Sequence, residues 1–250
     1  MRVRSTGRDW SNTLIKNYNS SMAQLVFDIE TVGMPIESFD EAQQQYLLKL
    51  AEREETPQRQ ERKREELIAQ FNLYPFTAQA VAIAMLNVES HKGRVYYQAP
   101  TKESWRSEDN LIEYESGSER EILQKFWEDV RSYKQLITFN GRGFDCPFLL
   151  LRSAILGIKP TRNLMLPRSD TEHIDLLEKL TFSGATRRFN LDFYCKAFGI
   201  PSPKERLSGP QINALFAAGK YREIAQYCLD DVRATAELYQ RWRQFLSFED

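Results

Sequence analysis

The chain has 250 residues, of which 42% are hydrophobic and 28% charged, and its formal net charge is −1. This composition is that of a globular protein with a sizeable core, and it excludes the strongly basic field of proteins that bind nucleic acid through charge alone. Three dispersed cysteines indicate reduced thiols in a cytoplasmic protein, and a content of only two histidines excludes a histidine-rich zinc site. No run approaches about 18 apolar residues, so no membrane span is expected.

Residues 1–22 carry several basic side chains among polar residues and lack the apolar core of a secretory signal. We expect a leader or a disordered arm here, with a basic arm that touches nucleic acid as the alternative. Residues 23–250 contain no repeats and no low-complexity linker, and we interpret them as one domain.

The first predicted strand, 25–31, is an apolar run that carries Asp28 and Glu30. Side chains alternate between the two faces of a strand, so these two carboxylates point the same way. Two like charges on an otherwise buried strand repel each other and lose hydration, and a bound divalent cation is the usual compensation. The alternative is an exposed strand end with two solvated acids.

A helical insertion is predicted directly after this strand, at about residues 36–72. Ser38 and Glu41 have the spacing of a capping box for a helix to about residue 55, and Thr56-Pro57 begins a second helix to about residue 71. The second helix is mostly charged, with both signs interspersed, which favours a solvated surface. A lid or a hairpin that binds a protein partner is the alternative.

The remaining elements alternate between strands and helices. Apolar runs and turn residues predict a hairpin from 81–86 and 94–97, a short strand at 111–114 and a core strand at 135–139. Helical patterns cover 118–130, 145–157, 190–198 and 209–246. This order predicts an α/β fold in which helices cover a mixed sheet.

The loop after the strand that ends at Phe139 has the sequence Asn140-Gly141-Arg142-Gly143-Phe144-Asp145. Its two glycines permit a tight turn into a helix, and Asp145 falls near the helix N-terminus, where it could be an ordinary cap. The loop also lies beyond the carboxyl end of a central strand, where α/β sheets bind ligands. Asp145 is therefore a candidate partner of the first-strand acids.

In the C-terminal helical pattern, Tyr227 and Asp231 are four residues apart and therefore share a helix face. Asp230 points about 100° away and is expected to be solvated. Two weaker candidates precede this helix. We expect a structural role near the acids for Asp175, and Arg187-Arg188-Phe189 could grip a phosphate backbone beside a stacking ring. Exposed arginines that maintain solubility are the alternative for the latter.

Together, the segments Asp28-Ile29-Glu30, Asn140–Asp145 and Tyr227–Asp231 resemble the three ordered motifs of the DEDD 3′–5′ exonucleases, which belong to the ribonuclease H-like superfamily. The flanking text LVFDIET, ITFNGRGFD and YCLDD is similar to the exonuclease domain of family B DNA polymerases, and most similar to the stand-alone exonucleases related to that domain. The resemblance covers about residues 23–246 without the insertion. It implies a ribonuclease H-like mixed five-stranded sheet flanked by helices.

The resemblance also implies roles for the site residues. Asp28 would bridge two Mg²⁺ or Mn²⁺ ions, and Glu30 and Asp231 would hold the ion that binds the attacking water. Asp145 would help to hold the second ion. Tyr227 would orient or deprotonate the water, and orientation is the safer role because a phenol keeps its proton at neutral pH. The candidate substrate contacts in the second motif are Asn140, Arg142 and Phe144.

These observations predict a metal-dependent 3′–5′ exonuclease that hydrolyses phosphodiester bonds at the 3′ end of single-stranded nucleic acid, with DNA favoured over RNA. An exoribonuclease of the same mechanism is the first alternative, because nothing in the sequence separates the two sugars. A non-catalytic nucleic-acid-binding protein on the same fold is the second, although the intact acids argue against it.

Overall fold

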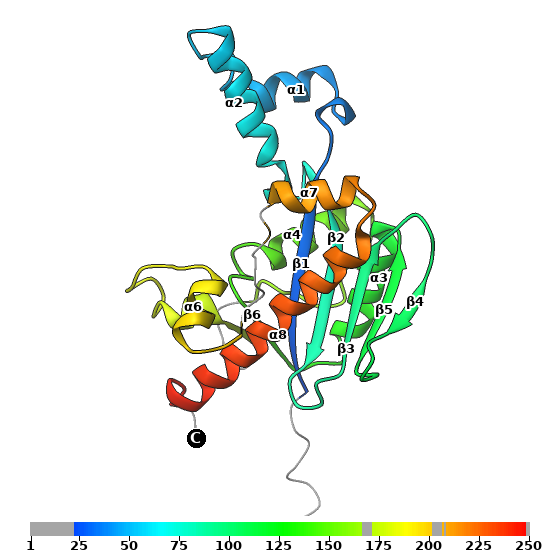
Figure 1. The fold of residues 1–250 in the computed structure, drawn as a ribbon, viewed down its shortest axis with the longest axis vertical. Helices are drawn as coiled ribbons and strands as arrows, with labels where there is room; N and C mark the ends of the chain where they lie inside the picture. Colours follow the sequence, from blue (N-terminus) through cyan, green and yellow to red (C-terminus); the bar gives the residue numbers. More distant parts are fainter. Residues whose placement is uncertain (1–22, 167–171, 202–206, 208, 249–250) are drawn as a thin grey trace, which may run out of the picture.

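The computed structural model describes residues 23–166, 172–201, 207 and 209–248, so the predicted arm at 1–22 lies outside the described residues. The described part of the chain forms a seven-stranded mixed sheet with the strand order β4-β5-β3-β2-β1-β6-β7 (Figure 1). The strands are β1 (Gln24–Gly33), β2 (Ala78–Asn87), β3 (Gly93–Gln98), β4 (Ser104–Arg106), β5 (Ile112–Gly117), β6 (Gln135–Thr138) and β7 (His173–Asp175). The sheet is mixed because β1 pairs with β2 antiparallel and with β6 parallel.

The predicted α/β class is therefore confirmed, and the expected number of five strands is wrong. The two additional strands are β4 and β7, at the two edges of the sheet, and each has three residues. Three residues are too few to show a period-two pattern, so these strands carry no sequence signal of their own.

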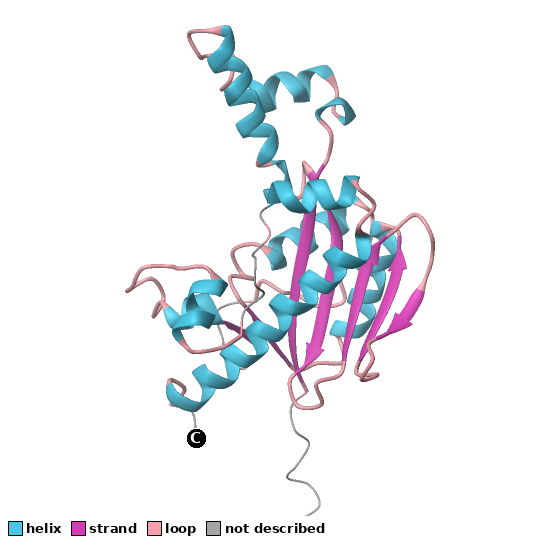
Figure 2. Cartoon of the chain, viewed as in Figure 1, coloured by secondary structure: helices cyan, strands magenta, loops and turns pink. Residues whose placement is uncertain are grey.

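Helices cover both faces of the sheet (Figure 2). The α-helices of the described residues are α1 (Glu41–Leu48), α2 (Pro57–Ala69), α3 (Glu119–Val130), α4 (Asp145–Ile155), α5 (Leu176–Leu180), α6 (Leu191–Ala197), α7 (Gly209–Ala217) and α8 (Tyr221–Phe245). The long helix α8 crosses one face, where it packs on β1, β2 and β3, and the helices α3 and α4 pack on the other. Among the described residues, no helix is both long enough and apolar enough to span a membrane.

The two faces of the sheet hold separate hydrophobic cores. On β1, Val26 belongs to the core under α8, whereas Phe27 and Ile29 belong to the core under α3 and α4. On β2, Ala82 and Ala84 face α8, and these small side chains let the helix approach the sheet closely. A register shift between Glu30 and Thr31 interrupts the β1–β2 ladder, and such a bulge bends a strand locally.

The helical insertion, which we define as residues 34–77 between β1 and β2, projects beyond the end of the sheet (Figure 1). The capping box of α1 consists of Asp40 and Gln43 rather than the predicted Ser38 and Glu41, and the helix ends at Leu48 rather than at about residue 55. Helices α1 and α2 pack around a small core of Ile36, Leu48 and Phe71, and no residue of α2 itself is fully buried. Both helices lie within the predicted bounds of about 36–72, and α2 has the solvated surface that its charge pattern predicts.

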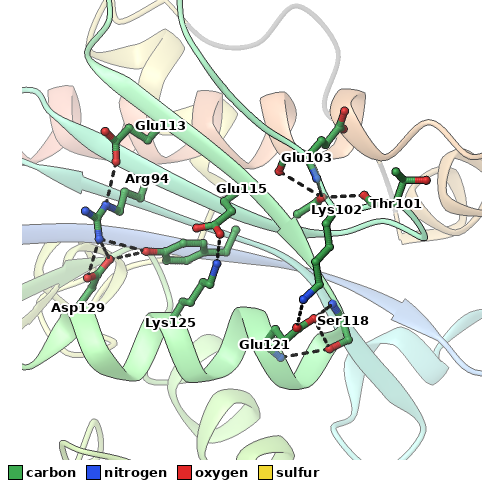
Figure 3. A network of polar contacts seen from close by, with 12 residues as sticks. Arg94, Thr101, Lys102, Glu103, Glu113, Glu115, Ser118, Glu121, Lys125 and Asp129 are labelled. Carbon is green, nitrogen blue, oxygen red and sulfur yellow. Dashed lines mark hydrogen bonds and ion pairs between the residues drawn. The ribbon is translucent and has the colours of Figure 1, made fainter.

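Charged side chains attach α3 to the outer strands (Figure 3). Arg94 of β3 donates to both carboxylate oxygens of Asp129 on α3 at 2.9 Å, and its Nε lies 3.3 Å from Glu113 of β5. Ser118 and Glu121 form the capping box that begins α3, as the pattern predicts. These side chains are partly exposed, so each pair adds little stability and the network mainly orients α3 on the sheet.

Candidate active site

Strand β1 presents Asp28 and Glu30 on the face that α8 covers. Val26 lies on this face and Phe27 and Ile29 lie on the other, as the alternation of a strand requires. Both acids are half-buried, whereas Phe27 and Ile29, which alternate with them along the strand, are buried. The predicted common face of the two carboxylates is therefore confirmed.

Helix α8 brings the third motif to the same place. Cys228 on this helix is fully buried, and its thiol donates to the carbonyl oxygen of Asp28 at 3.4 Å, so the helix lies directly on β1. Tyr227 is buried, and Asp231 follows it one helical turn later. Both side chains line a cleft beside β1. Asp230 instead accepts a hydrogen bond from Gln226, and its side chain is 40% exposed, as expected for a side chain that points about 100° away from Asp231.

Three carboxylates meet between strand and helix. Asp28, Glu30 and Asp231 each offer one oxygen, and these oxygens all lie within 4.8 Å of one another. Burial raises the pKa of the Cys228 thiol well above its usual range, and the nearby charges of these three acids raise it further. The cluster therefore creates a negative field, and its oxygen donors fit a hard divalent cation.

The fourth acid, Asp145, is the first residue of α4 and is buried. Its Oδ1 accepts a hydrogen bond at 3.1 Å from the N–H of Ile29, which stands between Asp28 and Glu30. The β1–β6 ladder ends at Val26, so this N–H further along β1 bonds to the carboxylate instead of to a neighbouring strand. Burial raises the pKa of Asp145 to about 7, against the lowering effect of this hydrogen bond.

The four acids line one cleft with a volume of 640 Å³, which we call the acidic cleft. Its described lining contains the four acids and Tyr227, together with Asn140 and Phe144 from the second motif. Arg142 is absent from this lining. Its guanidinium donates to the carbonyl oxygen of Leu166 at 2.9 Å and lies 3.9 Å from Glu178, and it contributes to a neighbouring pocket of 240 Å³.

Asp175 holds the loop of the second motif. Its Oδ1 accepts from the N–H of Asn140 at 2.9 Å, and its Oδ2 accepts from the N–H of Arg142 at 2.9 Å. The same carboxylate caps α5 through the N–H of Leu177. Asn140 has a φ of 62°, a strained conformation for a residue with a side chain, and the bonds to Asp175 stabilise it. The expected structural role of Asp175 near the acids is confirmed.

Gly141 has no room for a side chain. A Cβ atom at this position would lie 2.4 Å from Oγ1 of Thr138, the last residue of β6. The chain thus turns tightly over the end of β6 before α4 begins, and this turn delivers Asp145 to β1.

The residues of the cleft lining that the sequence pattern missed include Leu73, Tyr74 and Asn190. Leu73 and Tyr74 follow α2 at the base of the insertion, and Asn190 caps α6. No motif marks the first two, because they lie at the end of the short 3₁₀ helix Phe71–Leu73 and directly after it, and no periodicity predicts where they point. The sequence pattern predicted Asn190 only as the first residue of a helix.

His173 makes the stability dependent on pH. It is buried on β7 with its Nε2 2.9 Å from Thr138 Oγ1, and burial lowers its pKa to about 3. The unfolded chain binds a proton below about pH 6.5 that the folded chain excludes, so this contribution is lost as the pH falls. When the pH falls from 7 to about 4.5, the free energy of unfolding should therefore decrease by about 2–3 kcal/mol less in His173→Gln than in the wild type. Urea unfolding at the two pH values measures this difference, and equal losses would contradict it.

Comparison with known proteins identifies the family. The family of predicted 3′–5′ exonucleases related to the exonuclease domain of PolB matches residues 76–247. The chain belongs to this family. The match includes the second and third motifs, and the strand with Asp28 and Glu30 lies outside it. The predicted membership of a 3′–5′ exonuclease family is thus confirmed.

Curated relatives and a solved structure agree with this assignment. The DNA polymerase of Pyrococcus glycovorans is 28% identical over 166 residues, which are 58% of this chain and 20% of that polymerase. The catalytic chain of DNA polymerase epsilon from Aspergillus fumigatus is 24% identical over 50% of this chain and 6% of that protein. The family B DNA polymerase of Pyrobaculum calidifontis shares the fold, with a TM-score of 0.55 at 20% identity over 90% of this chain and 25% of the polymerase. The chain therefore spans a small part of the length of these relatives.

Proposed function

We propose that the chain removes nucleotides from the 3′ end of single-stranded nucleic acid, with DNA favoured over RNA. The observation that carries this proposal is the meeting of Asp28, Glu30 and Asp231 within 4.8 Å in a cleft that also contains Asp145. The names of the relatives, which are DNA polymerases, support DNA as the substrate.

The donor set fits divalent metal ions. Asp28 and Glu30 on β1 and Asp231 on α8 contribute one carboxylate oxygen each to the cluster. Such hard donors suit Mg²⁺ or Mn²⁺. In this proposal Asp28, Glu30 and Asp231 would hold one ion, and Asp28 and Asp145 would hold a second. When bound, a pair of ions supplies a metal-activated water nucleophile and positive charge opposite the transition state of phosphodiester hydrolysis.

Tyr227 and the second-motif loop complete the proposed site. The phenol of Tyr227 projects from α8 one turn before Asp231, where its O–H can orient the attacking water toward the phosphorus. Asn140 and Phe144 line the same cleft, and we assign them to the substrate strand. The contacts of Arg142 with Leu166 and Glu178 favour a role in fixing the loop over the substrate-binding role that its position in the motif predicts.

The test is digestion of 5′-labelled single-stranded DNA and RNA of one sequence with Mg²⁺, with Mn²⁺ and with EDTA. We expect a ladder that shortens from the 3′ end with either metal and is absent in EDTA, because the acids need the ions to accept a phosphodiester. Faster shortening of RNA would select the exoribonuclease. Binding of both strands without cleavage under any of these conditions would show that the chain is a non-catalytic nucleic-acid-binding protein rather than an exonuclease.

A further inference from the structure

The base of the helical insertion is fixed to β1. The hydroxyl of Thr31, directly after Glu30, donates to the carbonyl oxygen of Asn72 at 2.7 Å. The hydroxyl of Thr77 donates to the carbonyl oxygen of Phe71 at 2.8 Å, and both hydrogen bonds are buried. The turn at residues 71–74, which we call the foot of the insertion, therefore keeps a defined position beside the acids.

Two apolar side chains of the foot point into solvent at the acidic cleft. Leu73 is 47% exposed and Tyr74 is 53% exposed, and both line the cleft that contains the four acids. The small core of the insertion does not use them, because it consists of Ile36, Leu48 and Phe71 with their neighbours. Large apolar groups left exposed at the rim of a site are typical of a binding surface.

A second aromatic group approaches the cleft from the segment before α6. Phe189 lines the cleft and stacks on Phe193, with ring centroids 4.2 Å apart and an interplanar angle of 10°. The guanidinium of Arg187 lies 5.0 Å from the centre of the Phe189 ring. Phe193 is 53% exposed, so the stack reaches solvent. Figure 1 shows α6 beside the sheet near β6, whereas the insertion projects beyond the end of β1.

We propose that Leu73 and Tyr74 form one wall, and Phe189 the other, of a slot that holds the terminal bases of the single strand by stacking. This inference rests on the proposed exonuclease function, because it assigns the substrate to the same cleft. Aromatic rings bind every base through its π-face without reading sequence, and Arg187 adds a positive charge for the backbone phosphates. Leu73 and Tyr74 lie outside the segment that matches the family, 76–247, so the insertion contributes this wall to the site.

Tyr74→Ala tests the wall, with Tyr46→Ala as its matched control. Tyr46 belongs to α1 of the same insertion and is 80% exposed, and it does not line the acidic cleft. We expect Tyr74→Ala to weaken binding of a single-stranded oligonucleotide about 5- to 150-fold, as loss of one stacked base does. Tyr74→Phe keeps the ring and should bind like the wild type, as should Tyr46→Ala. Fluorescence anisotropy in EDTA measures binding without cleavage, and KM with Mn²⁺ should rise in parallel while kcat changes less.

A second substrate isolates stacking from other contacts. With abasic residues at the last positions of the 3′ end, Tyr74→Ala and the wild type should have the same affinity and KM. Equal affinity of Tyr74→Ala, Tyr46→Ala and the wild type for the intact strand would contradict the proposed base-stacking wall. It would not contradict the proposed exonuclease activity. Failure of the wild type to shorten any strand would overturn the exonuclease, and the anisotropy comparison would then still decide whether the wall binds bases.

Discussion

Asp231→Ala is expected to lower the rate of 3′-end digestion about a thousandfold or more, whereas Asp230→Ala is expected to leave it within a few-fold of the wild type. Asp231 belongs to the three acids whose oxygens converge within 4.8 Å. Loss of one such oxygen removes several kcal/mol of transition-state stabilisation, and each 1.4 kcal/mol corresponds to about tenfold in rate. Single-turnover digestion of a 5′-labelled strand in Mn²⁺ measures both variants.

The neighbouring Asp230 is a closely matched control for Asp231. Asp230 has the same side chain on the same helix, and its carboxylate binds Gln226 away from the cleft. Both substitutions change the net charge equally, so a general electrostatic effect on substrate binding would affect them alike. Equal loss of activity in the two variants would contradict the assignment of Asp231 to the site. Thermal unfolding of both proteins controls for misfolding.

Local periodicity allowed the first and third motifs to be placed from sequence. Asp28 and Glu30 share a face because strand side chains alternate, and the four-residue spacing of Tyr227 and Asp231 places both at the cleft. The same helical geometry turns Asp230 away. These relations depend only on neighbours along the chain, which is why a sequence pattern contains them.

Long-range contacts could not be predicted in this way. The bond from Ile29 to Asp145 joins positions 116 residues apart, and the bonds from Asp175 to the second-motif loop join positions 33 and 35 residues apart. Neither pairing leaves a period in the sequence. The resemblance placed Asp145 in the site, but only the fold shows that Arg142, three residues earlier, lies outside the acidic cleft. The short edge strands β4 and β7 escaped prediction because their pairing partners define them.

The second large effect that we expect is on stability. Arg152→Met should lower the free energy of unfolding by about 3–5 kcal/mol, because it leaves the buried carboxylate of Glu119 without its cation. Arg152 on α4 binds Glu119 on α3 through two hydrogen bonds of 2.7 and 2.8 Å, and both side chains are only 9% exposed. Glu119 also accepts the N–H of Ala80, and Arg152 donates to the carbonyl oxygen of Pro75 at 3.3 Å. The pair thus joins two helices to the start of β2.

A double substitution separates loss of the cation from loss of packing. In Arg152→Met with Glu119→Gln, no buried charge remains, and the amide oxygen at position 119 can still accept the N–H of Ala80. We expect this protein to recover most of the stability lost in the single variant, since replacing both members of a buried pair is often close to neutral. Lys125→Met removes a cation from a partly exposed pair with Glu115 and should change stability by no more than about 1 kcal/mol. Urea unfolding of the three variants measures these differences. If the double variant is as unstable as Arg152→Met, then lost packing and the lost bond to Pro75, rather than an unpaired charge, cause the destabilisation.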